Sequence, residues 1–86
     1  MTRRTTSTST RLHRVSTEYG DVVLNEATGA YWHLNASASR IVAVLESGGT
    51  VQDAVADLVA TYGIEEGMAR RDIEAVAQRL RDLGVL

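Results

Sequence analysis

The chain contains no cysteine. This absence excludes a disulfide framework, a thiolate metal site and a cysteine nucleophile, and it fits a reducing compartment. No apolar run is long enough for a signal peptide or a membrane-spanning helix, because the opening residues are mostly Thr, Ser and Arg. We therefore expect a cytoplasmic protein that makes no contact with a membrane.

Positive charge is also scarce. The chain has nine basic side chains, all of them arginine, against eleven acidic ones, and its formal net charge is −2. A domain that binds nucleic acid is usually basic, because contacts with phosphates supply much of its affinity. The charge balance therefore argues against nucleic acid as a partner.

The length of 86 residues, of which 44% are apolar, is that of one small folded domain. A chain of this size buries only about 60 to 65% of the surface that its unfolded form exposes, so the function is expected to need a partner. Residues 1–10 are mostly Thr, Ser and Arg without apolar periodicity, and we expect them to form a disordered tail. Residues 11–86 then form the predicted domain.

Alternating and β-branched residues predict three short strands, over residues 11–17, 21–26 and 30–35. Turns expected at residues 19–21 and 26–29 join them into an antiparallel meander. The third strand holds two of the four aromatic residues of the chain. Its alternation places Trp32 and Leu34 on one face, as anchors to the core, and Tyr31 and His33 on the other.

Apolar residues at helical spacing predict three helices, over about residues 36–47, 51–62 and 66–83. Asn35 or Ser37 can cap the first helix, and Thr50 with Asp53 can cap the second. Glycines follow the end of each predicted helix. The fold class is therefore α+β, a three-stranded antiparallel meander followed by three helices that cover one face of the sheet, similar to a winged helix-turn-helix.

A winged helix-turn-helix raises the alternative of a small DNA-binding regulator, whose last helix would enter the major groove. That helix does carry four arginines, but acidic residues lie among them at three- and four-residue spacing, as on a solvated helix face. His13 and His33 have no cysteine partner and no metal-ligand spacing, and no nucleophile motif or phosphate-binding loop is present. We predict no catalytic residue, no metal and no cofactor.

The order of several short motifs resembles the PqqD family, over about residues 11–86. These motifs are Asp21-Val22-Val23-Leu24-Asn25, Gly29-Ala30-Tyr31-Trp32-His33-Leu34-Asn35, then Ala36, Ser37, Ile41 and Leu45, then Gly49-Thr50-Val51-Ala54-Val55, and finally Arg79, Leu80, Leu83, Gly84 and Leu86.

The resemblance implies a non-catalytic domain that recognises the leader segment of ribosomally made precursor peptides. A free-standing chain of this length is similar to the leader-binding protein of lasso-peptide biosynthesis, which presents the leader to a separate cysteine peptidase and a cyclase. The alternative within the family is a PqqD-type peptide chaperone that serves a radical enzyme. The oligomeric state stays open, with a monomer preferred.

The resemblance also implies a site, because in that family the leader adds as an antiparallel strand to the third strand and lies in a groove beside the third helix. An edge strand offers unpaired main-chain groups for such an addition. The expected peptide-binding residues are Ala30, Tyr31, Trp32, His33 and Leu34 on the strand, through their main chain, and Asp72, Ile73, Val76 and Arg79 on the helix.

Overall fold

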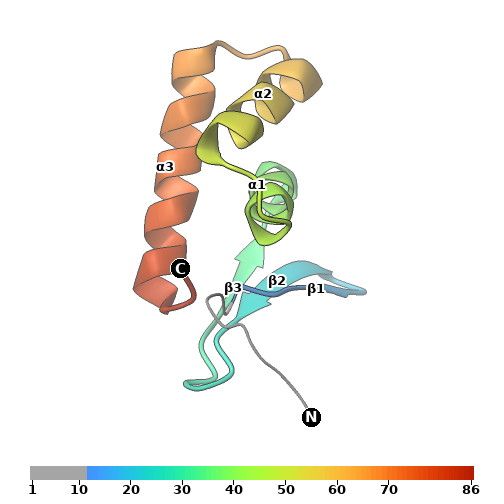
Figure 1. Cartoon of the computed structure of the whole chain (residues 1–86). Coiled ribbons are helices and arrows are strands. Elements are labelled where there is room, and N and C mark those ends of the chain that lie inside the picture. Colours follow the sequence, from blue (N-terminus) through green and yellow to red (C-terminus); the bar gives the residue numbers. More distant parts are fainter. Residues whose placement is uncertain (1–11) are drawn as a thin grey trace.

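The computed structural model describes residues 12–86, so the expected tail over residues 1–10 lies outside the described residues. The strands are β1 (Arg14–Thr17), β2 (Gly20–Leu24) and β3 (Tyr31–Leu34), and the helices are α1 (Ala36–Glu46), α2 (Val51–Tyr62) and α3 (Glu66–Leu83). Figure 1 shows the three helices on one side of the small sheet. The predicted α+β class and the order of elements are confirmed.

The sheet is antiparallel with the order β1-β2-β3, so among residues 12–86 β3 has one neighbour and one open edge. All three strands are shorter than predicted. β1 begins at Arg14 rather than residue 11, and Leu12, at 2% exposure, belongs to the buried core instead of the ladder. β2 ends at Leu24 and β3 begins at Tyr31, because the residues between them form a wide turn.

That turn closes on Asn25. The main-chain N–H of Gly29 donates to the Asn25 carbonyl oxygen, and the N–H of Asn25 donates to the Ala30 carbonyl oxygen, both at 2.8 Å. Two residues thus oppose one, which is a β-bulge whose first residue, Gly29, adopts a φ of +78° that favours glycine. The bulge fixes the register in which Val23 faces Trp32 and Asp21 faces Leu34.

Helix ends follow the predicted capping signals. The Asn35 side chain accepts from the N–H of Ala38 at 2.8 Å and caps α1. Thr50 and Asp53 form a complete capping box on α2, in which Asp53 supplies the returning acceptor. α3 has the predicted bounds, and it ends where Gly84 takes a left-handed conformation.

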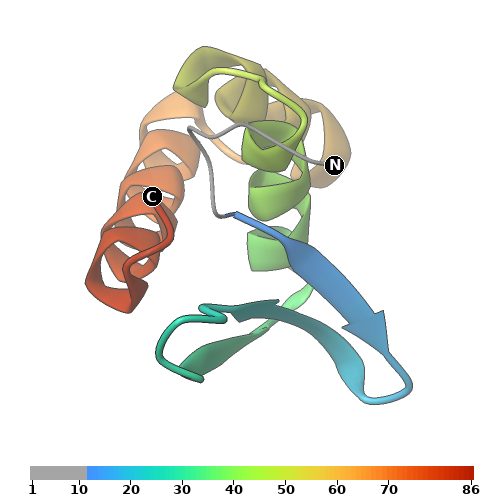
Figure 2. The same ribbon diagram turned by 60° about the horizontal axis from the view of Figure 1, so that its bottom comes forward.

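The core lies between the inner face of the sheet and the buried faces of the three helices. α3 packs on α2 and α1, and Figure 2 shows the β2–β3 turn beside the C-terminal end of α3. This arrangement places α3 next to the open side of β3. The largest fully buried side chains are Ile41, Leu58, Ile73, Leu80, Val23, Val42 and Val55.

Candidate functional site

The open edge of β3 offers main-chain groups from alternate residues. In an antiparallel pair, each residue directs its N–H and C=O either to its partner strand or away from it. Asn25 and Ala30 are hydrogen-bonded at the bulge, and counting along the register from there makes Trp32 and Leu34 the residues bonded to β2. The N–H and C=O groups of Tyr31 and His33 therefore point to the open edge.

The side chains of β3 divide between the two faces of the sheet as predicted. Trp32 and Leu34 are half-buried and pack against the core cluster. Tyr31, at 65% exposure, and His33 lie on the outer face, with their ring centroids 5.7 Å apart. One face of β3 thus anchors the strand, while its edge and outer face stay accessible.

A hollow of about 290 Å³ lies between β3 and α3, lined by Trp32, Ala75, Val76 and Arg79. We call it the Trp32 hollow. The guanidinium carbon of Arg79 lies 5.5 Å from the centroid of a Trp32 ring, within the range of a cation–π contact. Ala75 leaves space at the helix surface because its side chain is a single methyl group. The hollow therefore has an aromatic wall, an aliphatic floor and a cation at its rim.

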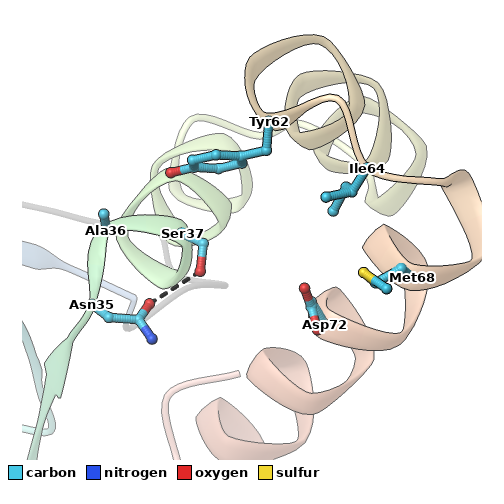
Figure 3. A pocket seen from close by; sticks show the side chains of 7 residues that line it. All are labelled: Asn35, Ala36, Ser37, Tyr62, Ile64, Met68 and Asp72. Atoms are coloured by element: carbon cyan, nitrogen blue, oxygen red, sulfur yellow. Dashed lines mark hydrogen bonds between the residues drawn. The ribbon is translucent and has the colours of Figure 1, made fainter.

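A second hollow, of about 430 Å³, lies further along α3 toward its N-terminal end. Figure 3 shows its lining, which comes from the start of α1, the end of α2 and the start of α3. We call it the Asp72 hollow, because Asp72 supplies its only charged side chain. Its lining residues are Asn35, Ala36, Ser37, Tyr62, Ile64, Met68 and Asp72.

Both hollows share one face of α3, which we call the groove face; the groove is the space between this face and β3. Met68, Asp72, Ala75 and Arg79 recur at spacings of four, three and four residues, which places them along one side of a helix. Three of the predicted side-chain residues, Asp72, Val76 and Arg79, line these hollows. The structure therefore brings the predicted segment of β3 and most of the predicted helix residues to the same region.

Ile73 does not reach either hollow. Its side chain is 0% exposed and lies in the core cluster, so the structure places it behind the hollows and not in their lining. Ile73 belongs to the buried stripe with Val76 and Leu80, and the groove face is rotated from that stripe by part of a turn. Sequence reasoning missed Met68 and Ala75, although their spacing with Asp72 and Arg79 was the available signal.

Electrostatic contacts hold the sheet against α1 on the inner face. Arg14 lies 2.7 Å from the Asp21 carboxylate, which also accepts hydrogen bonds from Ser16 and Ser39. The bond from Ser39, followed by those from Ser16 and Arg14, lowers the pKa of Asp21 from its usual value near 3.8 to about 2. Asp21 is therefore negatively charged near neutral pH, and its partners tie β1 and β2 to α1.

Within residues 12–86, no group of three His, Asp or Glu side chains is placed to hold a metal ion. In the same part of the chain, each helix is too short or too polar to cross a membrane.

Comparisons with known proteins agree with this geometry. Residues 21–86 match the family described as Coenzyme PQQ synthesis protein D (PqqD). A solved structure described as lasso peptide synthetase B1 complexed with the leader peptide is 35% identical, with a TM-score of 0.77 over 86% of this chain and 87% of that chain. TbiB1 in complex with the TbiA(beta) leader peptide is 27% identical, with a TM-score of 0.79 over 91% of both chains. No curated protein matches the chain.

Proposed function

Because the chain belongs to the PqqD family, we propose that it is a non-catalytic binding domain for the leader segment of a ribosomally made precursor peptide. The observation that carries this proposal is the open edge of β3 beside two hollows on α3. Two similar solved proteins, the lasso peptide synthetase B1 and TbiB1, are each in complex with a leader peptide.

The leader adds as an antiparallel strand to β3. Residues 30–34 supply the ladder through their main chain, with Tyr31 and His33 donating and accepting at the open edge. Main-chain hydrogen bonds give affinity without reading sequence, so the selection of one leader comes from side-chain hollows. Asp72, Val76 and Arg79 take that role, whereas Ile73 supports α3 from the core.

The bound leader is then delivered to a separate cysteine leader peptidase and a cyclase in lasso-peptide maturation. The 35% identity to a lasso peptide synthetase B1 over most of both chains supports this biosynthetic role. The PqqD description of the family favours a second candidate, a peptide chaperone for a radical enzyme. Both candidates use the same groove, and they differ in the enzyme that receives the peptide.

NMR titration tests the binding mode. A synthetic leader of the precursor encoded beside this gene, added to the ¹⁵N-labelled chain, should shift the amide signals of residues 30–34 and of the groove face of α3 most strongly. Binding that leaves the amides of Tyr31 and His33 unchanged would contradict strand addition to β3.

An activity assay tests delivery. Cleavage of the full precursor by the neighbouring leader peptidase should be slow alone and faster when this chain is added at equal concentration. A precursor that keeps the cleavage site but has the N-terminal part of its leader replaced by a Gly-Ser sequence provides the control, because this chain should not make its cleavage faster. Equal cleavage rates with and without the chain would contradict delivery, whatever the binding experiment gives.

A further inference from the structure

Two charged side chains on the groove face of α3 lack an ion partner among residues 12–86. The Asp72 side chain makes no hydrogen bond or ion pair within residues 12–86, and the only polar interaction of the Arg79 side chain there is its cation–π contact with Trp32. Some other charged residues of α3 have partners: Arg70 lies 3.7 Å from the Glu66 carboxylate, and Asp82 accepts from Gln78 at 3.0 Å. Arg71 and Glu74 also have no partner within residues 12–86, but they line neither hollow. Within the part of the chain that the structure describes, the groove therefore carries one negative and one positive charge without an ion partner.

Asp72 lies in a setting that suits a basic side chain. The Asp72 hollow has apolar walls from Ile64 and Met68, and Figure 3 shows both side chains beside the Asp72 carboxylate. A Lys or Arg side chain can pack its aliphatic stem on such walls and place its charged end on a carboxylate. An acidic side chain in the same place would meet a like charge.

Arg79 lies in a setting that suits an acidic side chain. Its guanidinium carbon lies 5.5 Å from the centroid of a Trp32 ring, and its N–H donors have no hydrogen-bond acceptor within residues 12–86. Those donors match the two oxygens of a carboxylate. The same contact holds the long Arg79 side chain near the open edge of β3, so less rotamer freedom is lost when an anion binds.

Asp72 and Arg79 are far enough apart to contact different side chains of a bound peptide. Seven residues of helix separate them, which is about 10 Å along the α3 axis. An extended peptide rises about 3.3 Å per residue, so the matching peptide side chains lie about two to four residues apart. Leu34 at the end of β3 leads through Asn35 into the Asp72 hollow, so an antiparallel peptide has its N-terminal side there.

We propose that this groove selects a leader with a Lys or Arg side chain in the Asp72 hollow and, toward the C-terminus of the leader, an Asp or Glu side chain at Arg79. This inference rests on the proposed function, and it adds the charge pattern of the peptide and the direction in which that pattern runs.

Selection from a displayed library of random 15-residue peptides tests the proposal. The unmodified chain should enrich peptides with a basic residue about two to four positions before an acidic one. Asp72→Lys should replace the preference for a basic residue by one for an acidic residue and leave the second position unchanged. Arg79→Glu should replace the preference for an acidic residue by one for a basic residue and leave the first position unchanged. Selected peptides, once synthesised, should lose affinity by about tenfold when the matching charge is reversed.

Glu74→Lys and Arg81→Glu are matched controls. Each makes the same change of charge two residues further along α3, about 200° around the helix and outside both hollows. Both controls should keep the preference of the unmodified chain. Thermal unfolding of all four variants checks that they fold, and Asp72→Asn, which should erase the first preference without inverting it, replaces Asp72→Lys if the latter fails to fold.

The outcomes separate the two proposals. Peptides that bind and shift the amides of Tyr31 and His33 but show no charge preference would overturn the charge pattern and keep the proposed function. The same preference in the groove variants and the unmodified chain would also overturn it. A library with no enriched peptide, or one whose peptides leave those amides unchanged, would overturn the proposed function itself.

Discussion

The side-chain amide of Asn25 donates to the carbonyl oxygen of Leu83 at 2.8 Å, across 58 residues of sequence. The same side chain accepts from the main-chain N–H groups of Ala27 at 2.9 Å and Thr28 at 3.4 Å. One buried residue therefore shapes the β2–β3 turn and holds the last turn of α3 against it. This contact ties the C-terminal end of α3 to the turn that leads into β3.

We predict that Asn25→Ala lowers the free energy of unfolding by about 2 kcal/mol, because a buried side chain with several hydrogen bonds is removed. Urea unfolding followed by circular dichroism measures this loss. Asn25→Asp separates the two roles, since the carboxylate can still accept from the turn but cannot donate to Leu83. Full stability of Asn25→Asp at pH 7 would mean that the contact with Leu83 contributes nothing.

Proline at position 33 should abolish leader binding with a small effect on stability. The N–H of His33 points to the open edge and is not part of the ladder with β2, and proline is tolerated on an edge strand where its missing N–H would face outward. Isothermal titration with the synthetic leader measures the change. His33→Ala is the control, because it keeps the N–H and should keep most of the affinity. Similar binding by the two variants would show that the main chain of residue 33 is not used.

Ala75→Trp should block the Trp32 hollow. Ala75 is exposed on α3 and lines that hollow, so a large neutral side chain fills space without disturbing the core. We expect leader affinity to fall by at least about tenfold, which corresponds to about 1.4 kcal/mol, with little change in the unfolding midpoint. Gln78→Trp, also exposed on α3 but outside the hollow, should bind normally. Equal losses in both variants would indicate a general effect of the added side chain.

Stability should decrease in acid through Asp21. Its folded pKa of about 2 lies below its usual value near 3.8, so its contribution is fully present above pH 3.8 and is lost as the pH falls toward 2. Asp57, whose pKa is lowered by the hydrogen bond from Arg40, acts in the same direction. Urea midpoints measured from pH 5 to pH 2 should fall less steeply for Asp21→Asn than for the unmodified chain. Parallel curves would contradict this assignment.

Sequence patterns were sufficient to predict the helices and to predict which side chains of β3 face the core. Capping residues mark helix ends locally, and Thr50, Asp53 and Gly84 act as predicted. Alternation placed Trp32 and Leu34 inward and Tyr31 outward. The resemblance to the PqqD family is confirmed as well. These features depend on neighbouring residues, or on a motif order that spans the chain.

Other features depend on contacts between distant segments. The rotation of α3 about its axis buries Ile73 and opens Ala75, and it is set by packing on α1 and α2 rather than by the α3 sequence alone. β1 is shorter than its alternation suggests because Leu12 leaves the strand direction to enter the core. The role of Asn25 as a link to Leu83 had no local signal, since the two residues meet only in the folded chain.

The contact between Asn25 and Leu83 also bears on how the chain folds. Contacts between residues far apart in sequence form late, because the chain must lose much of its conformational freedom before they are made. One wall of the groove comes from β3 and the other from α3, so a nascent or partly unfolded chain has no groove. A ligand that binds only the native state raises the apparent stability. Under the proposed function, the leader should therefore slow proteolysis of the chain that binds it.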